Sequence, residues 1–445
     1  MFFILFIMSS IMVLLPLALA KRYGTISMIS PLHIVGYLSF FGIFSKTLYL
    51  HAFNGEMYFQ RFVSSTTPVI DGYLFIFGFI LMICLGYVFA VKRIWKVEPG
   101  FTGLEVISQI KHPRLLVVLA VFISLIVIAQ MISARGLGGI SSVLKLSTID
   151  AVSSKKVLRI EGTTGFGATN AAIRLFLFVP QLALAVYITR YFLFRRDLMI
   201  MLGLFSLELF LVVLQGKRFH LINIVALFVI ISALLGREFN FKIFFKGILG
   251  AIFMAIFFVI MTSFRSNKDD AGAIIFDVTN AIKHIFGATY FLDVNIPIII
   301  ISKAKEIPYF FGETYFFWTF AWIPRAVWAN KPAVSLGSFI KSDLLGITGT
   351  LGGYNATGPG EAFLNFGWMG ILVGFFLGFS YRKLEVFTLS PKGMKRHYGF
   401  WIYPIIIFPL IIGTLQSSFS ASLTPAIVTW VILIFLLGFL ADRKQ

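Results

Sequence analysis

The stretch GYLFIFGFILMICLGYVFAV, residues 72–91, decides the fold class of this chain. It is about 20 residues long and carries no charge, which is enough for a helix to cross the roughly 30 Å hydrocarbon core of a bilayer. Similar runs recur along the 445 residues, of which 58% are hydrophobic and only 13% are charged. Globular proteins carry about 25% charged residues. The sequence therefore predicts an all-α, polytopic membrane protein that forms a single integral membrane domain over residues 1–445.

The apolar runs predict about eleven transmembrane helices. The predicted spans cover residues 2–20, 31–48, 72–91, 115–134, 173–192, 198–214, 219–236, 243–262, 361–381, 399–414 and 422–441. An extra N-terminal span or a missed pair inside 289–323 would give a count between ten and thirteen. The first run resembles a signal peptide, because Ala18-Leu19-Ala20 mimics a cleavage site. No basic residue precedes it, so we interpret it as a retained span.

Arginine and lysine fall in alternate loops, and they predict the orientation because short cytoplasmic loops retain positive charge. The series predicts an exterior N-terminus and a cytoplasmic C-terminus. The basic clusters lie at 21–22, 92–96, 190–196, 237–246, 382–396 and 443–444.

Two long exterior segments, 135–172 and 263–360, hold most of the basic residues that this orientation places outside. Long loops tolerate such charge without any function. The functional alternative is an electrostatic funnel that attracts an anion. Segment 263–360 also contains apolar pieces and an aromatic belt, YFFGETYFFWTFAWIPRAVW (309–328). Aromatic residues favour the water–lipid boundary, so the belt predicts helices in the interface or a re-entrant pair.

Three arginines at the predicted exterior rim are candidate ligands of a phosphate group, because guanidinium pairs with phosphate bidentately. Arg218 lies in a very short turn between two spans, Arg265 ends a span, and Arg325 lies in the aromatic belt. Structural alternatives remain open. Arg218 can anchor its helix by snorkelling, and Arg265 can pair with Asp269 or Asp270.

Glu361 is the candidate general base, because it opens the ninth predicted span directly after three residues that let a substrate approach closely, Gly358-Pro359-Gly360. Its alternative role is to interact with the helix macrodipole. His284 is a less favoured candidate for proton transfer. Further candidates for binding a substrate are Lys331, Asn330, Tyr354, Asn355 and His284.

Metal and cofactor chemistry is not expected from this sequence. Its one cysteine, Cys84, lies inside an apolar run, and its six histidines have no metal-ligand spacing. Glu208 is the one carboxylate clearly inside a predicted span, where ionisable groups are costly and often functional. We expect it to pair with a polar group on a neighbouring helix.

The number of spans, the arginine in a tight exterior turn and the large exterior loop before GEAFLNFGWMGILVGFFLG (360–378) together resemble the O-antigen polymerase (Wzy) family. The resemblance covers most of the chain as a pattern, with specific identity confined to 325–380. The arginine–ten residues–glycine pattern of some members is not met, because Arg159 and Arg325 both miss its spacing.

The resemblance implies a GT-C-like, metal-independent glycosyltransferase in the bacterial inner membrane. Such enzymes polymerise oligosaccharide repeat units carried on undecaprenyl pyrophosphate, at the outer face of that membrane. A lipid-linked donor and acceptor, membrane lipids, a flippase and a chain-length regulator are the implied partners, and nucleic acid is not among them. The alternatives are a transporter or flippase of the same glycolipid, an O-antigen ligase-type transferase, and a membrane scaffold without enzymatic activity.

Overall fold

The computed structural model describes residues 2–26, 28–91, 107, 110–133, 175–215, 218–236, 291–321, 323, 327–328, 331–347, 353–396 and 398–440. Within these ranges every regular element is a helix. The predicted span 243–262 and the predicted exterior loop 135–172 lie outside the described residues.

The chain divides into two compact units. Unit 1 comprises Met1–Val97, Ile282–Gly399 and Ile406–Ile427. Unit 2 comprises Glu98–Ala281, Phe400–Ile405 and Val428–Gln445.

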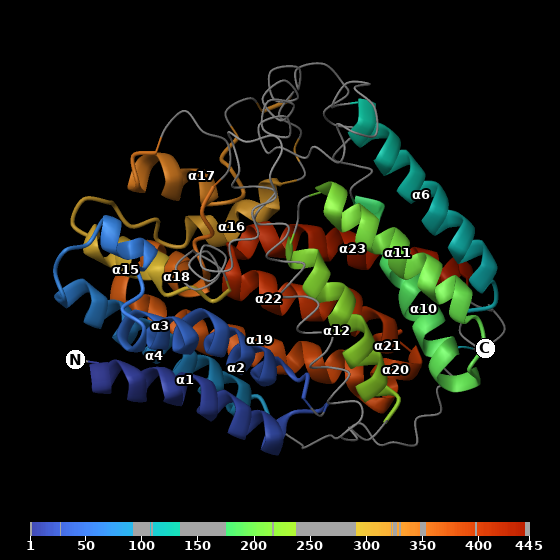
Figure 1. The fold of residues 1–445 in the computed structure, drawn as a ribbon, viewed down its shortest axis with the longest axis horizontal. Coiled ribbons are helices and arrows are strands. Elements are labelled where there is room, and N and C mark those ends of the chain that lie inside the picture. Colours follow the sequence, from blue (N-terminus) through green and yellow to red (C-terminus); the bar gives the residue numbers. More distant parts are fainter. Residues whose placement is uncertain are drawn as a thin grey trace. The chain divides into compact units, whose positions relative to one another are not determined.

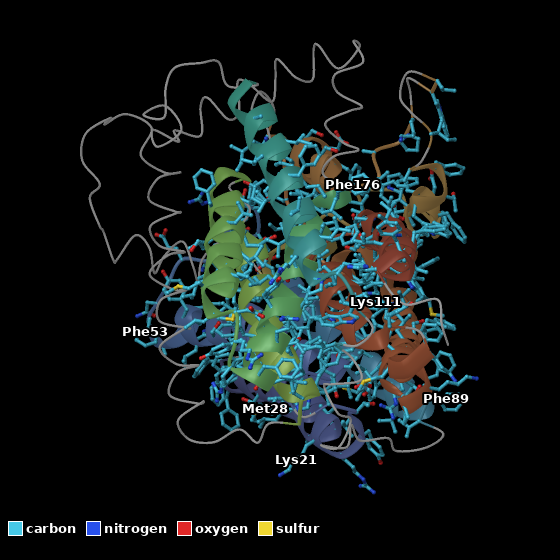
Figure 2. All side chains as sticks on the ribbon, turned by 90° about the vertical axis from the view of Figure 1, so that its right-hand side faces the viewer. Lys21, Met28, Phe53, Phe89, Lys111 and Phe176 are labelled. Atoms are coloured by element: carbon cyan, nitrogen blue, oxygen red, sulfur yellow. The ribbon has the colours of Figure 1, made fainter. Side chains whose placement is uncertain are left out.

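By length and composition alone, five helical runs in the described part of the chain are long and apolar enough to cross a membrane. Four shorter helices are also apolar, so the expectation of an α-helical membrane protein holds at this level of detail. Large apolar side chains such as Phe53 and Phe89 are 71% and 74% exposed and project away from the ribbon, as lipid-facing side chains do (Figure 2). The five are α1 (Phe2–Tyr23), α4 (Thr67–Phe89), the run Gly358–Leu389, the run Gly399–Gln416 and α23 (Phe419–Leu440).

Unit 2 contains four of the apolar helices, and α10 contacts the other three (Figure 1). A turn joins α10 to α11, and an ion pair between Arg190 Nε and Asp197 Oδ2, 2.7 Å apart, stabilises it. The elements are α6 (Pro113–Ser133), η4 (Leu175–Leu177), α10 (Phe178–Phe194), α11 (Leu198–Gln215) and α12 (Arg218–Leu234).

Unit 1 is built around α4 and α19, which pack in parallel. Its N-terminal elements are α1, α2 (Pro31–Ser39), the π-helical turn η1 (Phe40–Phe44), α3 (Ser45–Ala52), η2 (Tyr58–Arg61) and α4. Its later elements are α15 (Asn295–Ser302), α16 (Glu313–Phe320), α17 (Gly337–Phe339), η5 (Ile340–Leu344), α18 (Gly358–Phe366), η6 (Gly367–Gly370), α19 (Ile371–Leu389), α20 (Pro391–Arg396), α22 (Phe408–Gln416) and the first part of α23. The short elements α21 (Gly399–Ile402) and η7 (Tyr403–Ile407) fall mostly in unit 2, which includes Phe400–Ile405.

The two ends of unit 1 can be told apart by contacts between helix termini. The ring of Phe2 lies 4.8 Å from that of His51, so the start of α1 and the end of α3 share one end. We call this the rim end; the sequence predicts that it faces the exterior. At the opposite end Thr25, which follows α1, contacts the last turns of α19. The end of α1 at 21–22, the end of α4 at Tyr87 and the last turns of α19 around 382 therefore lie at the same end of unit 1.

Glycines allow the backbones of α4 and α19 to touch. A Cβ on Gly86 would overlap the carbonyl oxygen of Phe375, and one on Gly378 would overlap that of Ile83. Gly374 and Gly378 form a small-xxx-small pattern, which permits such close approach between membrane helices.

We therefore predict that Gly86→Ala lowers the stability of the protein by about 1–3 kcal/mol, because the added methyl group forces the two helices apart. Gly203→Ala in α11 is the matched control, since a Cβ there meets nothing within 4 Å. Thermal unfolding of the detergent-purified variants measures the difference. Equal midpoints for the two variants would contradict the close packing.

The predicted span 361–381 is not one straight helix. Gly367 adopts a φ of 56° and ends α18, and Gly370 then packs against the carbonyl of Ala362. The chain reverses between these two glycines, because residues eight apart in a continuous helix would be about 12 Å from each other. The sequence-based prediction missed this break, since both glycines are compatible with an apolar helix pattern.

The contacts with α4 show that α18 and α19 run in opposite directions. Gly358 faces Phe79, whereas the ring of Phe363 lies 5.1 Å from that of Phe75, so α18 advances toward the rim end. α19 then returns alongside α4 toward the opposite end. α18 is thus a short helix that begins beside the middle of α4.

α15 is enclosed by the bundle. Six of its residues, from Asn295 to Ile300, are buried, and Ile298 packs on Gly72 of α4. α16 differs, because Phe316 and Phe320 remain exposed at its surface. Segment 263–360 therefore contributes both a helix inside the bundle and an aromatic helix at its surface.

Candidate functional site

The structure describes some of the candidate residues and not others. Glu361, Lys331, Tyr354 and Asn355 are described. Arg218 begins α12, but its side chain lies outside the description. Arg265, His284, Arg325 and Asn330 also lie outside the described residues.

Glu361 lies inside the bundle rather than at its rim, which corrects the position expected from a straight ninth span. Its side chain is 1% exposed. The hydroxyl of Thr314 donates to Oε1 at 2.8 Å, and the backbone N–H of Phe419 donates to Oε2 at 2.6 Å. The carboxylate therefore links α18 to α16 and to the start of α23.

Further hydrogen bonds extend this link into a network. The amide of Asn365, one turn after Glu361, donates to the hydroxyl of Thr314 at 2.7 Å and to the carbonyl of Glu361 at 2.8 Å. Its oxygen accepts from the N–H of Gly312 at 2.9 Å. Ser420 donates to the carbonyl of Thr314 at 2.6 Å. We call Glu361, Thr314, Asn365 and Ser420 the Glu361 network.

The start of α18 is strained. Thr357, its N-cap, has a φ of 62° and a ψ of 155°, a conformation that is costly for a β-branched residue and persists only when its surroundings impose it. Its hydroxyl accepts from the N–H of Gly360 at 3.3 Å, and Pro359 occupies the first turn, where its missing N–H does no harm. A Cβ on Gly358 would lie 2.7 Å from the carbonyl oxygen of Thr414, so the end of α22 presses directly on this turn.

Lys331 is engaged by the protein itself. Its ammonium group donates to the carbonyls of Ala321 and Ile323 at 3.1 and 2.7 Å, just after the end of α16. Cations at this position satisfy the carbonyls that a helix end leaves open. In the structure Lys331 therefore stabilises the segment that follows α16, and its predicted role in binding an anion stays a prediction.

Tyr354 is also part of a structural contact. Tyr58 donates to its hydroxyl at 2.7 Å, and the two rings stack with centroids 5.2 Å apart. Burial and the hydrogen bond to Tyr354 both raise the pKa of Tyr58, so this phenol stays neutral. Asn355 is exposed one residue further on. Among the predicted substrate-binding residues that the structure describes, Asn355 is exposed, whereas Tyr354 and Lys331 are partly buried.

A second buried cluster near the rim end was not predicted. Lys46 of α3 forms an ion pair with Asp293, and both side chains are buried. Asn295 donates to the same oxygen of Asp293 at 2.8 Å and accepts from the N–H of Phe59 at 3.0 Å. This cluster holds the start of α15 against α3 and η2. The sequence signal that could have indicated this cluster is Lys46 itself, a charged residue near the end of the apolar run 31–48.

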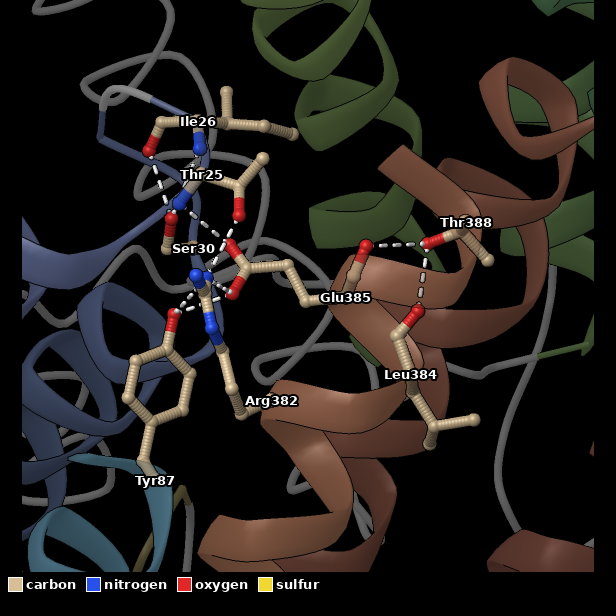
Figure 3. Close-up of polar contacts among 8 residues, drawn as sticks. All are labelled: Thr25, Ile26, Ser30, Tyr87, Arg382, Leu384, Glu385 and Thr388. Atoms are coloured by element: carbon tan, nitrogen blue, oxygen red, sulfur yellow. Dashed lines mark hydrogen bonds and ion pairs between the residues drawn. The ribbon is translucent and has the colours of Figure 1, made fainter. Parts of the chain in front are cut away.

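A third cluster lies at the opposite end of unit 1 (Figure 3). Arg382 Nη1 lies 2.8 Å from Glu385 Oε2 and donates to Thr25 Oγ1 at 2.7 Å. Tyr87 donates to Glu385, and the N–H of Thr25 donates to the other carboxylate oxygen at 2.9 Å. The sequence suggested that Arg382 and Lys383 were equivalent loop cations. The structure buries Arg382 in this cluster and leaves Lys383 exposed.

Glu208 occupies a buried position in unit 2. Its carboxylate on α11 is 3% exposed, and within the described part of the chain its Oε1 has no hydrogen-bond partner. The expected pairing with a neighbouring helix is therefore not seen at that oxygen. No group of three or more acidic, histidine or cysteine side chains with metal-site geometry occurs within the described ranges.

The chain matches no protein-family model, no curated protein and no solved structure. The Glu361 network combines a buried carboxylate, a strained helix start and a broken membrane helix, which makes it the best candidate for function.

Proposed function

We propose that this protein is a membrane-embedded glycosyltransferase that polymerises lipid-linked oligosaccharide repeat units into a long surface polysaccharide. The reaction would take place at the outer face of the bacterial cytoplasmic membrane, without metal or nucleotide. The polyprenyl pyrophosphate of the donor would leave as the glycan is transferred to an acceptor hydroxyl.

One observation carries the proposal: α18 begins inside the apolar bundle and carries a buried carboxylate, Glu361, in its first turn. A broken helix is tolerated at such a position when it is enclosed by protein or lines a polar cavity. A carboxylate has about four sites that accept protons in hydrogen bonds. The hydrogen bonds that Glu361 accepts from Thr314 and Phe419 leave capacity for an acceptor hydroxyl. In the proposal Glu361 accepts the proton of this hydroxyl as it attacks.

Arginines would supply the complementary charge. Arg218, Arg265 and Arg325 come from segments predicted to reach the exterior surface, and the chain has a formal net charge of +19. Guanidinium groups fixed near the departing pyrophosphate would stabilise the negative charge that develops on it. In the proposal four further residues would make additional contacts with the substrate, namely Lys331, Asn330, Asn355 and His284.

We predict that Arg218→Ala and Arg325→Ala each reduce long-chain polymer by at least about 100-fold, as expected when an anion-stabilising group is lost. Gel analysis of the surface polysaccharide in cells that express each variant measures this. Arg61→Ala, in the exterior segment after α3, is a matched control and should leave chain length unchanged. Wild-type chain lengths in both test variants, at equal protein levels in the membrane, would refute the assignment.

The second candidate function is transport of the same glycolipid. The broken helix and the buried carboxylate of Glu208 favour it, since transporters place interrupted helices and ionisable groups at mid-membrane. A transporter would move labelled glycolipid across a vesicle membrane without changing its chain length.

A further inference from the structure

The turn between α22 and α23 brings two unpartnered donors to the start of α18. Leu415 lies against Gly358, and the N–H of Phe419 is bonded to Glu361. Gln416 and Ser418 stand between these two contacts along the chain. They are 6% and 1% exposed, and neither Gln416 Nε2 nor Ser418 Oγ has a hydrogen-bond partner among the residues that the structure describes.

Such unpaired groups need an explanation. A buried polar atom without a partner costs about 1–3 kcal/mol, and most buried polar atoms in proteins are therefore paired. Here two unpaired donors come from one turn that touches the same helix start as a buried carboxylate. The strained backbone of Thr357 lies at that helix start as well.

We propose that Gln416 and Ser418 complete a subsite that binds one hydroxyl group beside Glu361. The hydroxyl oxygen accepts from Gln416 Nε2 and from Ser418 Oγ, and its proton is donated to the carboxylate. The bound hydroxyl thereby gives Gln416 Nε2 and Ser418 Oγ an acceptor and gives the Glu361 carboxylate a further donor. A buried water and a sugar hydroxyl both have this chemistry, and the sugar alternative rests on the proposed function.

The arrangement defines roles that sequence motifs did not suggest. Gln416 and Ser418 are positioning residues that hold the hydroxyl, whereas Glu361 is the group that takes its proton. The donors polarise the hydroxyl oxygen only weakly, because both are neutral. Their main effect is therefore on binding and orientation.

Ser418→Ala and Gln416→Met test the subsite, with Ser422→Ala as control. The control removes a hydroxyl one turn further along, whose 3.0 Å bond to the Ser418 carbonyl is made within the protein. Thermal unfolding in detergent is measured for each protein alone and with a panel of methyl glycosides at millimolar concentration. The same variants are assayed for transfer between lipid-linked repeat units.

The two sources of the hydroxyl give different results. If water fills the subsite, Ser418→Ala lowers the unfolding midpoint without any added ligand, by about 2 °C or more, because the water loses a partner. If a sugar fills it, the midpoint of Ser418→Ala is unchanged or higher, and the stabilisation by at least one glycoside is lost in both variants. In that case KM for the acceptor rises on the order of tenfold with little change in kcat.

The subsite is overturned if both variants unfold at or above the wild-type midpoint and respond to glycosides as the control does. A different outcome separates the two claims: Ser418→Ala unfolds at a lower temperature, glycosides stabilise none of the proteins, and the wild-type protein forms no polymer. That outcome would support a water-filled subsite and refute the proposed function. The two claims therefore fail separately.

Discussion

Replacing Glu385 by leucine is expected to remove most of the folded protein from the membrane. The substitution leaves the guanidinium of Arg382 buried without its carboxylate partner and takes away the acceptor of Tyr87 and of the Thr25 N–H. Breaking a buried ion pair from one side costs about 3–5 kcal/mol, which is a large share of the stability of a typical domain. Fluorescence-detected size exclusion of a tagged protein measures the folded yield.

The double variant Arg382→Met with Glu385→Leu should recover much of the loss, because apolar residues of similar volume often replace a buried pair without penalty. Lys383→Met is the matched control on the same helix, since that side chain is exposed. A Glu385→Leu protein as abundant and as stable as Lys383→Met would contradict the role assigned to this cluster.

Glu361 should give two distinct phenotypes, depending on the substitution. In Glu361→Leu the hydroxyl of Thr314 and the N–H of Phe419 lose their acceptor. Two buried donors without partners cost about 2–6 kcal/mol together, so this variant should fold poorly. Glu361→Gln retains one carbonyl oxygen and nearly the same shape, so it should fold.

The folded Glu361→Gln protein isolates the chemical role of the carboxylate. If Glu361 is the general base, transfer falls by about 100- to 10,000-fold, because an amide cannot take up the proton. Glu313→Gln, an exposed acidic residue in the first turn of α16, should transfer at the wild-type rate. If Glu361→Gln polymerises at a rate within a few-fold of wild type, Glu361 is not the general base and its role is purely structural.

Helices were the part of the fold that the sequence predicted well. The opening run 72–91 corresponds to α4, Thr67–Phe89, because an apolar segment of that length has few alternatives to a helix. Four predicted spans in the described part of unit 2 also fall on α6, α10, α11 and α12 within a few residues, and the predicted span 243–262 lies outside the described residues.

The break between α18 and α19 was not predictable from the same signal. Gly367 and Gly370 fit an apolar helix pattern as well as they fit a reversal, and what decides is the packing of Gly370 on Ala362. Periodicity and hydropathy do not contain that information. As a result, the prediction placed Glu361 at the rim, whereas the structure places it in the interior.

Buried pairs were hidden for a different reason. Lys46 and Asp293 are 247 positions apart in the chain. Arg382 and its exposed neighbour Lys383 are both cations at the end of one apolar run, so the sequence does not distinguish them. A charge count assigns such residues to loops, whereas only the assembled bundle shows which of them has a buried partner. The sequence suggested Glu361 as a candidate because a carboxylate next to a Gly-Pro-Gly turn is conspicuous. Gln416 and Ser418 became candidates only once the structure showed their buried, unpaired donors.

The most direct test of the central claim uses purified protein and a lipid-linked repeat unit. The protein is incubated in detergent or vesicles with polyprenyl-pyrophosphate-linked oligosaccharide, without nucleotide and with a metal chelator, and the products are separated by length. Our account predicts a ladder of products that grows by whole repeat units, and a strongly reduced ladder with Glu361→Gln. Unchanged substrate with folded wild-type protein would contradict it.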